Sequence, residues 1–279
     1  MSWWEALILG IVQGLTEFLP VSSSGHLEIG QALLGTTSSD NLTFAVLVHV
    51  ATVCSTLVVL WSEVSWILKG CFTTIKWNEE KDYAAKIIIS MIPIFIVGVF
   101  FKDYVESLFG NSLILVGVCL LITSLLLALS DFITINQQKK QADSEHEIGR
   151  SVNYLDALII GIAQSIAVLP GLSRSGSTIS TGLLCGVKKS EIAQFSFIMV
   201  IIPILGEALL DTIDIISTGT FGNDLPIVSA IVGFIAAFVT GCFACKFMIN
   251  IVRRGRLIWF ALYCLIVGIL AICLNTWIL

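Results

Sequence analysis

The feature that most constrains this chain is a series of apolar runs, each long enough or nearly long enough to cross a lipid bilayer. The hydrocarbon core of a bilayer is about 30 Å thick and takes about 20 apolar residues in an α-helix. Because unpaired backbone groups are costly in lipid, such runs are expected to fold as helices. The sequence predicts about six transmembrane helices, at roughly 41–61, 83–101, 112–130, 190–217, 226–250 and 257–277.

The composition agrees with a membrane protein. Of the 279 residues, 56% are hydrophobic and 13% are charged, and the mean hydropathy is +0.95. A soluble domain usually carries about 25% charged residues. The N-terminus has neither a basic region nor a small-residue cleavage site, so no removable signal peptide is expected. We therefore expect an all-α polytopic membrane protein, and we find no basic patch that would bind nucleic acid.

Two further apolar stretches are interrupted by polar residues. The first interruption, QGLTEFLPVSSSGH, covers residues 13–26 and separates short arms at 3–19 and 26–35. The second, PGLSRSGST, covers 170–178 within an apolar element at 153–187. Proline breaks a helix, and irregular backbone at membrane depth is tolerated only where it is buried in protein or lines a cavity. These patterns predict two re-entrant helical hairpins.

The two halves of the chain resemble each other at a spacing of 151 residues. The matches include Gly10 and Gly161, Gln13 and Gln164, Ser22 and Ser173, Gly35 and Gly186, and Phe44 and Phe195. Each half has one broken hairpin and three spans, and three is odd, so the halves would insert in opposite directions. We expect one integral membrane domain over 1–279, an inverted-topology repeat with repeat one at 1–135, a linker at 136–150 and repeat two at 151–279. Such repeats place a site near the midplane, where helix N-termini face anions.

The positions of the cations predict the orientation. Of the fifteen Lys and Arg residues, thirteen fall on one predicted side, one falls on the other and Arg174 belongs to the second motif; the thirteen are Lys69, Lys76, Lys81, Lys86, Lys139, Lys140, Arg150, Lys188, Lys189, Lys246, Arg253, Arg254 and Arg256. By the positive-inside rule this side, which includes the loop at 62–82, is cytoplasmic. Both termini are then predicted to lie outside.

Arg174 is the most informative single residue. A lone Arg near the midplane needs an anion or a carboxylate, and its guanidinium fork matches phosphate. Ser173, Ser175 and Thr178 add hydroxyl donors, and Gly176 allows close backbone approach. These residues predict phosphate binding. The alternative is an internal ion pair between Arg174 and Glu17.

The first motif offers a nucleophile beside a base, in Ser22, Ser23 and Ser24 followed by His26. A helix cap is the alternative role for these serines. Gln13 and Glu17 lie four residues apart and project from one helix face.

Glu17 would orient His26, activate water or hold a divalent cation. A structural hydrogen bond across the hairpin is the alternative. His49, in the middle of a span without a motif, is expected to be a packed, hydrogen-bonded histidine. Glu207, Asp211 and Asp214 are expected to be carboxylates at the outer rim.

At these two motifs the sequence resembles the undecaprenyl-diphosphate phosphatase family of bacitracin-resistance proteins. The first motif of that family appears as Gln13, Glu17, Pro20, Ser22, Ser23, Gly25 and His26, and the second as Pro170, Gly171, Ser173, Arg174, Ser175, Gly176 and Thr178. The resemblance covers nearly the whole chain. Gln13 stands where the family also allows Glu, which leaves Glu17 as the only carboxylate of the motif.

The resemblance implies hydrolysis of undecaprenyl diphosphate to undecaprenyl phosphate and inorganic phosphate in the bacterial inner membrane. This reaction recycles the lipid carrier for cell-wall synthesis and confers bacitracin resistance. The implied catalytic residues are Glu17, Ser23, His26 and Arg174, with Ser23 as the first candidate for nucleophile and His26 or water as rivals. The implied phosphate-binding residues are Gln13, Ser22, Ser24, Ser173, Ser175, Gly176 and Thr178.

The implied cofactor is a divalent cation, Mg²⁺ or Ca²⁺, with Glu17 as its ligand. The expected partners are a polyprenyl diphosphate and membrane lipid, without nucleic acid, and a homodimer is left open.

Three other classes of protein share some of these sequence features. Inverted repeats with broken helices are also a transporter architecture, so a transporter or lipid-phosphate flippase is the main alternative. A non-catalytic scaffold is disfavoured, because ionisable groups at membrane depth cost about 2.5–3.5 kcal/mol each. The phosphatidate-phosphatase class, which also has an SGH motif, needs a His six residues after its Arg. Residue 180 is Ser, which excludes that class.

Overall fold

The fold was analysed in a computed structural model, which describes residues 1–35, 38–101, 104, 105, 107, 108, 113–140, 149–218, 225–254 and 256–278. Within these ranges the side chains of 38–42, 136–140, 207, 211, 212, 214–218, 253, 254 and 275–278 are not described. Every regular element of the described chain is a helix, and one isolated bridge joins Arg150 and Val187.

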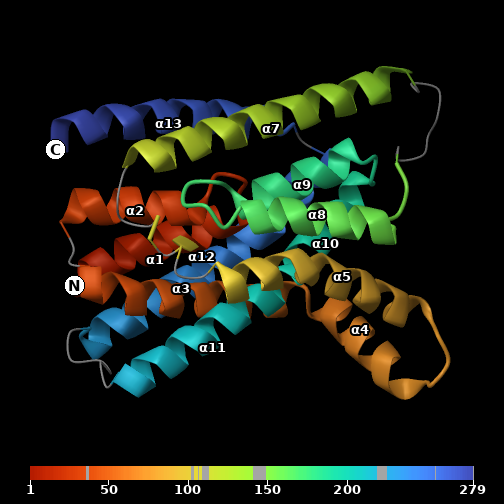
Figure 1. Ribbon diagram of the computed structural model, residues 1–279, viewed down its shortest axis with the longest axis horizontal. Helices are drawn as coiled ribbons and strands as arrows, with labels where there is room; N and C mark the ends of the chain where they lie inside the picture. The colour runs from red at the N-terminus through yellow and green to blue at the C-terminus, as the bar shows by residue number, and fades with distance from the viewer. Residues whose placement is uncertain are drawn as a thin grey trace.

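The helices follow the predicted order along the chain (Figure 1). The first half contains α1 (Trp3–Phe18), α2 (Ser23–Leu34), α3 (Ser38–Val59), α4 (Trp61–Thr73), α5 (Glu79–Phe100) and α7 (Leu113–Lys140). The second half contains α8 (Tyr154–Ile166), α9 (Arg174–Leu184), α10 (Lys189–Met199), α11 (Ile201–Thr218), α12 (Ile227–Arg254) and α13 (Ile258–Ile278).

The described helices confirm a multi-pass membrane protein. Four stretches are long and apolar enough to cross a bilayer: Glu79–Phe100, Leu113–Ile135, Lys189–Leu210 and Ile227–Val252. A fifth would be the pair Thr43–Val59 and Trp61–Thr73, which is bent by 78°, and Ile258–Leu274 is a shorter apolar helix.

Two boundaries differ from the sequence prediction. The loop expected at 62–82 begins with helix α4, whose exposed apolar face carries Trp61, Trp66 and Phe72. Helix α7 continues to Lys140, into the expected linker, because 131–140 adds no proline or glycine to stop it. The rest of that linker, at 141–148, lies outside the described residues.

Both interrupted stretches form a helix, a turn and a second helix. Ser22 caps α2 by accepting a hydrogen bond from the backbone N–H of Gly25 (3.3 Å). Ser173 caps α9 by accepting one from the N–H of Gly176 (3.0 Å). A serine hydroxyl can satisfy a backbone donor that the first helical turn leaves unpaired. The capping alternative is therefore what the geometry shows for Ser22, and Ser173 has the same role in the second motif.

The N-terminal ends of α1 and α8 are also capped in the same way. Ser2 and Glu5 form a capping box at the start of α1, and Asn153 and Asp156 form one at the start of α8. Arg150 in addition forms a bidentate ion pair with Asp156, with Nη2 2.8 Å from Oδ1. The two hairpins therefore start, turn and restart with the same local chemistry.

Close packing of small residues brings the two halves together. Helix α1 packs on α12, α8 packs on α5, and α7 packs on α13, which lies beside it in Figure 1. A Cβ on Gly14 would lie 2.5 Å from the carbonyl oxygen of Ala237, and a Cβ on Gly268 would lie 2.9 Å from that of Gly117. Small residues allow helix backbones to approach closely within a membrane.

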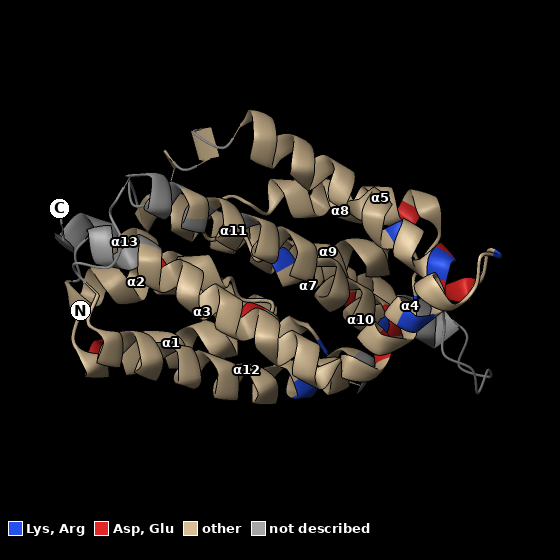
Figure 2. Ribbon diagram, turned by 90° about the horizontal axis from the view of Figure 1, so that it is seen from below, with Lys and Arg blue, Asp and Glu red and all other residues tan. Residues whose placement is uncertain are grey.

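Charge is distributed unevenly along the length of the molecule. Figure 2 shows most Lys and Arg segments at the end that contains α4 and α10. The labelled N- and C-termini lie together at the opposite end in both views.

Candidate functional site

The tips of the two hairpins meet inside the helical bundle. A Cβ on Gly25 would lie 3.0 Å from Cα of Gly171. The Ser175 hydroxyl donates a hydrogen bond across the junction to the carbonyl oxygen of Leu19 (3.1 Å). Motifs that lie about 150 residues apart in the sequence therefore form one site.

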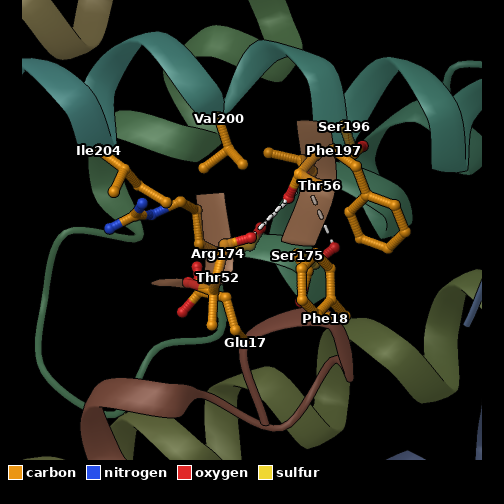
Figure 3. A pocket seen from close by; sticks show the side chains of 11 residues that line it. Glu17, Phe18, Thr52, Thr56, Arg174, Ser175, Ser196, Phe197, Val200 and Ile204 are labelled. Carbon is orange, nitrogen blue, oxygen red and sulfur yellow. Dashed lines mark hydrogen bonds between the residues drawn. The ribbon is translucent and has the colours of Figure 1, made fainter. Parts of the chain in front are cut away.

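A small pocket lies at this junction. Its lining combines polar side chains with an apolar wall, as Figure 3 shows. The lining residues come from α1, α3, α9, α10 and α11 and the connection between the last two: Glu17, Phe18, Thr52, Thr56, Arg174, Ser175, Thr178, Ser196, Phe197, Val200 and Ile204.

Glu17 is the carboxylate of this pocket and receives two hydrogen bonds on the same oxygen. Its Oε2 accepts from Ser23 Oγ at 2.7 Å and from Gln13 Nε2 at 2.9 Å. Gln13 is fully buried. The predicted i, i+4 pair on α1 is therefore present, and a serine hydroxyl at the start of α2 lies within hydrogen-bond reach of a base.

The turn that presents Ser23 is strained. Ser22 has a φ of +70° and is the non-glycine residue with positive φ in the described part of the chain. Its hydroxyl lies 3.3 Å from that of Ser24. Residues held in sparsely populated backbone regions cluster at functional sites.

Arg174 is the first residue of α9 and lines the pocket with Glu17. Its Nη1 is buried and has no hydrogen-bond partner, and no ion pair between described residues involves it. Its charge is close enough to act on the Glu17 carboxylate. A buried guanidinium nitrogen without a partner is costly, so this geometry is typical of a site that receives an anion.

The hydroxyls on α9 have local partners. Thr178 donates to the carbonyl oxygen of Arg174 (3.0 Å), and Ser173 Oγ lies 3.4 Å from Ser175 Oγ. Helices α2 and α9 both begin at the junction, at Ser23 and Arg174. The positive ends of two helix dipoles favour an anion there.

His26 points away from this pocket. Its Nδ1 lies 2.8 Å from the carbonyl oxygen of Ser22, and its Nε2 lies 2.8 Å from the hydroxyl of Tyr263 on α13. The two rings are stacked, with centroids 5.5 Å apart. The sequence grouped His26 with Ser23. In the structure Ser23 contacts Glu17 on α1, whereas the longer His26 side chain reaches Tyr263 on α13.

The structure instead places His49, which the sequence left outside the site, beside Glu17. Its Nε2 lies 3.8 Å from Glu17 Oε2. Thr52 and Thr56, which also line the pocket, follow it on α3. Positions 49, 52 and 56 share one helix face. This stripe of polar residues within an apolar span is the sequence signal that could have placed His49 at the site. The side chains of Glu207, Asp211 and Asp214 lie outside the described residues.

The donor set can be tested against a divalent cation. Among described residues, no three His, Cys, Asp or Glu side chains come together. The pocket offers the carboxylate of Glu17, and the amide oxygen of its neighbour Gln13 is buried without a partner. Mg²⁺ is commonly held by one or two carboxylates together with phosphate oxygens of a substrate. These residues fit an ion that is shared with a bound phosphate group, rather than a closed protein cage.

The fold and the pocket together define a polytopic helical membrane protein with a polar, anion-receptive site between two broken hairpins. Residues 6–270 match the model of the family described as bacitracin resistance protein BacA. The chain belongs to this family.

Several curated relatives are similar over nearly their full length. A protein of Bacteroides thetaiotaomicron named undecaprenyl-diphosphatase is 58% identical over 272 residues, 98% of each chain. One of Parabacteroides distasonis with the same name is also 58% identical over 98% of each chain. One from Korarchaeum cryptofilum, again so named, is 40% identical over 95% of this chain and 96% of its own.

Proposed function

We propose that this protein hydrolyses undecaprenyl diphosphate to undecaprenyl phosphate and inorganic phosphate. The observation that carries the proposal is the unpartnered guanidinium nitrogen of Arg174 in a pocket that it shares with Glu17, whose carboxylate accepts a hydrogen bond from Ser23. A guanidinium binds phosphate through paired hydrogen bonds. A hydroxyl beside a carboxylate base can lose its proton to that base and act as a nucleophile. The names of relatives at 58% identity support the same reaction.

The chemistry assigned to the pocket begins with attack by Ser23 Oγ on the terminal phosphorus of the diphosphate. Glu17 Oε2 takes the hydroxyl proton over 2.7 Å as the Oγ–P bond forms. The bond from that phosphorus to the bridging oxygen breaks, and the prenyl monophosphate leaves. Water then hydrolyses the phosphoserine to release inorganic phosphate and restore the hydroxyl. Direct attack by a water that Glu17 activates is the competing route.

Charge on the transferring phosphoryl group is stabilised mainly by Arg174 and by the N-termini of α2 and α9. The supporting phosphate-binding residues are Gln13, Ser22, Ser24, Ser173, Ser175, Gly176 and Thr178. Glu17 would also hold a divalent cation, Mg²⁺ or Ca²⁺, which would neutralise phosphate charge when bound. His26, whose ring nitrogens face Ser22 and Tyr263, is kept as the rival nucleophile or proton donor.

The proposal includes an inverted repeat in the bacterial inner membrane with both termini outside. The like-capped hairpins, the packing of α1 on α12 and of α8 on α5, and the cation-rich end opposite both termini support it. Hydrolysis at such a site would recycle the lipid carrier for cell-wall synthesis. That recycling accounts for resistance to bacitracin.

Phosphate release from C55 diphosphate by the purified protein in detergent tests the proposal. Arg174→Ala should lower the rate at least 100-fold, because removing one preorganised donor to developing charge typically costs about 10²–10³ in rate. Arg256→Ala, an exposed Arg outside the pocket, is the matched control. Full activity of Arg174→Ala would refute the assignment.

The same assay separates the phosphatase from the flippase alternative. Hydrolysis needs no vesicle, whereas transport does. Absence of phosphate release with and without added Mg²⁺ or Ca²⁺, together with movement of the lipid phosphate across reconstituted vesicles, would favour the flippase.

A further inference from the structure

The imidazole of His49 is held in one orientation by its own helix. Its Nδ1 lies 2.8 Å from the carbonyl oxygen of Ala45, one turn earlier on α3. A carbonyl oxygen only accepts, so Nδ1 carries the proton in this contact. The other ring nitrogen, Nε2, faces Glu17 Oε2 at 3.8 Å, and it attracts that carboxylate when it also carries a proton, as in the imidazolium form.

Three helices converge on the same carboxylate oxygen. Gln13 approaches Glu17 from α1, Ser23 approaches from α2, and His49 approaches from α3. The Glu17 side chain is only 9% exposed, so water has little access to compete with these contacts. Arg174, at the start of α9, lines the same pocket as Glu17. His49 supplies the contact to this carboxylate from α3.

We infer that His49 is a positioning residue of the phosphatase site, which holds the Glu17 carboxylate where it can take the proton of Ser23. The inference rests on the proposed function and extends it to a residue outside both sequence motifs. His49 acts through Glu17 and does not touch the transferred phosphoryl group. The contact with Ala45 fixes the orientation of the imidazole ring, and the contact with Glu17 holds the carboxylate beside Ser23.

Two substitutions with the same amide group separate these contacts. An Asn side chain places its amide near the position of Nδ1 and can keep the contact with Ala45, whereas Gln extends its amide to the position of Nε2 and can reach Glu17. If His49 positions Glu17, His49→Gln keeps phosphate release within about fivefold of the unsubstituted protein. His49→Asn should lower kcat about 10- to 100-fold, the range typical for loss of an orienting partner.

A structural role predicts the opposite order. If His49 only fastened its own helix through Ala45, His49→Asn would be the active variant and His49→Gln the impaired one. That result, or equal activity of the two variants, would overturn the inference. Melting temperatures in detergent identify a variant that has lost its fold.

A double-substitution cycle with Glu17→Gln provides a second measurement. Interaction energies between residues in contact appear as non-additive effects. If His49 acts through Glu17, His49→Asn should add no further loss to Glu17→Gln, and an additive loss would overturn the inference. Failure of the proposed function itself is recognised separately, because the unsubstituted protein would then release no phosphate.

Discussion

At the scale of single residues, a carboxylate and a guanidinium share one small pocket, and no ion pair joins them in the described part of the chain. Glu17 is engaged by Ser23 and Gln13, which leaves Arg174 Nη1 without a partner. The sequence left open an ion pair between the two. The geometry favours the other reading, since separate partners for the carboxylate keep the guanidinium free for an anion.

The substitution Glu17→Gln tests whether Glu17 is the general base that takes the Ser23 proton. The amide keeps the size of the side chain but cannot accept the Ser23 proton, and general base catalysis typically contributes about 10²–10⁴ in rate. We expect phosphate release to fall at least 100-fold while the melting temperature changes little. Glu79→Gln, on an exposed residue at the start of α5, is the control. A Glu17→Gln variant with unchanged kcat would contradict the assigned role.

The nucleophile is tested by trapping the phosphoenzyme. With substrate labelled on its terminal phosphate, quenching of the unsubstituted protein in dodecyl sulfate at neutral pH, which preserves phosphoserine and phosphohistidine, should leave label on the chain. Ser23→Ala should remove that label and His26→Ala should retain it, because Ser23 alone of the two contacts Glu17. Label lost only in His26→Ala would reverse the assignment, and no label on any variant would favour direct attack by water.

At the scale of elements, the site depends on two helix starts and the turns before them. Gly171 has a φ of +87°, and a Cβ there would lie 2.5 Å from the carbonyl oxygen of Val116. Glycine is permissive of that conformation, whereas other residues are strained in it. The turn before α9 is thus held against α7, and α7 in turn fixes where Ser173 begins the helix, since Thr123 accepts the N–H of Ser173 at 3.0 Å.

Gly171→Ala should therefore move the start of α9 and lower both stability and activity. A residue forced into an unfavourable backbone region costs on the order of 1–3 kcal/mol, before any clash with α7. Gly98→Ala is the control, because a Cβ there meets no atom within 4 Å. Melting temperature in detergent and phosphate release measure the effect. Equal stability of the two variants would show that the turn tolerates a side chain.

A second element-scale contact ties the start of α8 to the loop before it. Arg150 pairs with Asp156, which is 3% exposed, and the Arg150 guanidinium also donates to the carbonyl oxygen of Cys185. The nearby carboxylate raises the pKa of the Arg150 guanidinium further above its usual value, so this pair persists at any physiological pH.

Arg150→Gln should destabilise the protein by about 1–3 kcal/mol, because it leaves the buried Asp156 carboxylate without its charged partner. The melting temperature should fall, while kcat of the folded fraction stays near that of the unsubstituted protein. Lys76→Gln, at an exposed position of the same cation-rich region, serves as the control. An unchanged melting temperature for Arg150→Gln would show that the pair is not structural.

At the scale of the whole molecule, the separation of cations from termini predicts the orientation. By the positive-inside rule we expect the end with α4 and α10 to face the cytoplasm. In a cysteine-free background, a membrane-impermeant maleimide should label Ser2→Cys on intact cells and should label Lys76→Cys only after lysis. The reverse pattern would invert the topology, and labelling of both on intact cells would contradict a fixed orientation.

The sequence by itself determined the helical membrane class, the two broken hairpins and four of the eleven residues that line the pocket, namely Glu17, Arg174, Ser175 and Thr178. Apolar run length, proline and glycine positions and the motif around Arg174 act locally, so they can be read without coordinates. Residues 13–26 and 173–178 were placed in one site on this basis.

Only the tertiary structure decided which side chains meet. Ser23 and His26 lie one turn apart on α2, yet His26 contacts Tyr263 of α13 while Ser23 contacts Glu17 of α1. His49 and the threonines after it lie in a different helix, and no local pattern states which neighbour that helix faces. The bend after α3 and the length of α7 also depend on packing against other helices. Contacts between distant segments are set by the way the helices assemble, and a linear motif does not record that assembly.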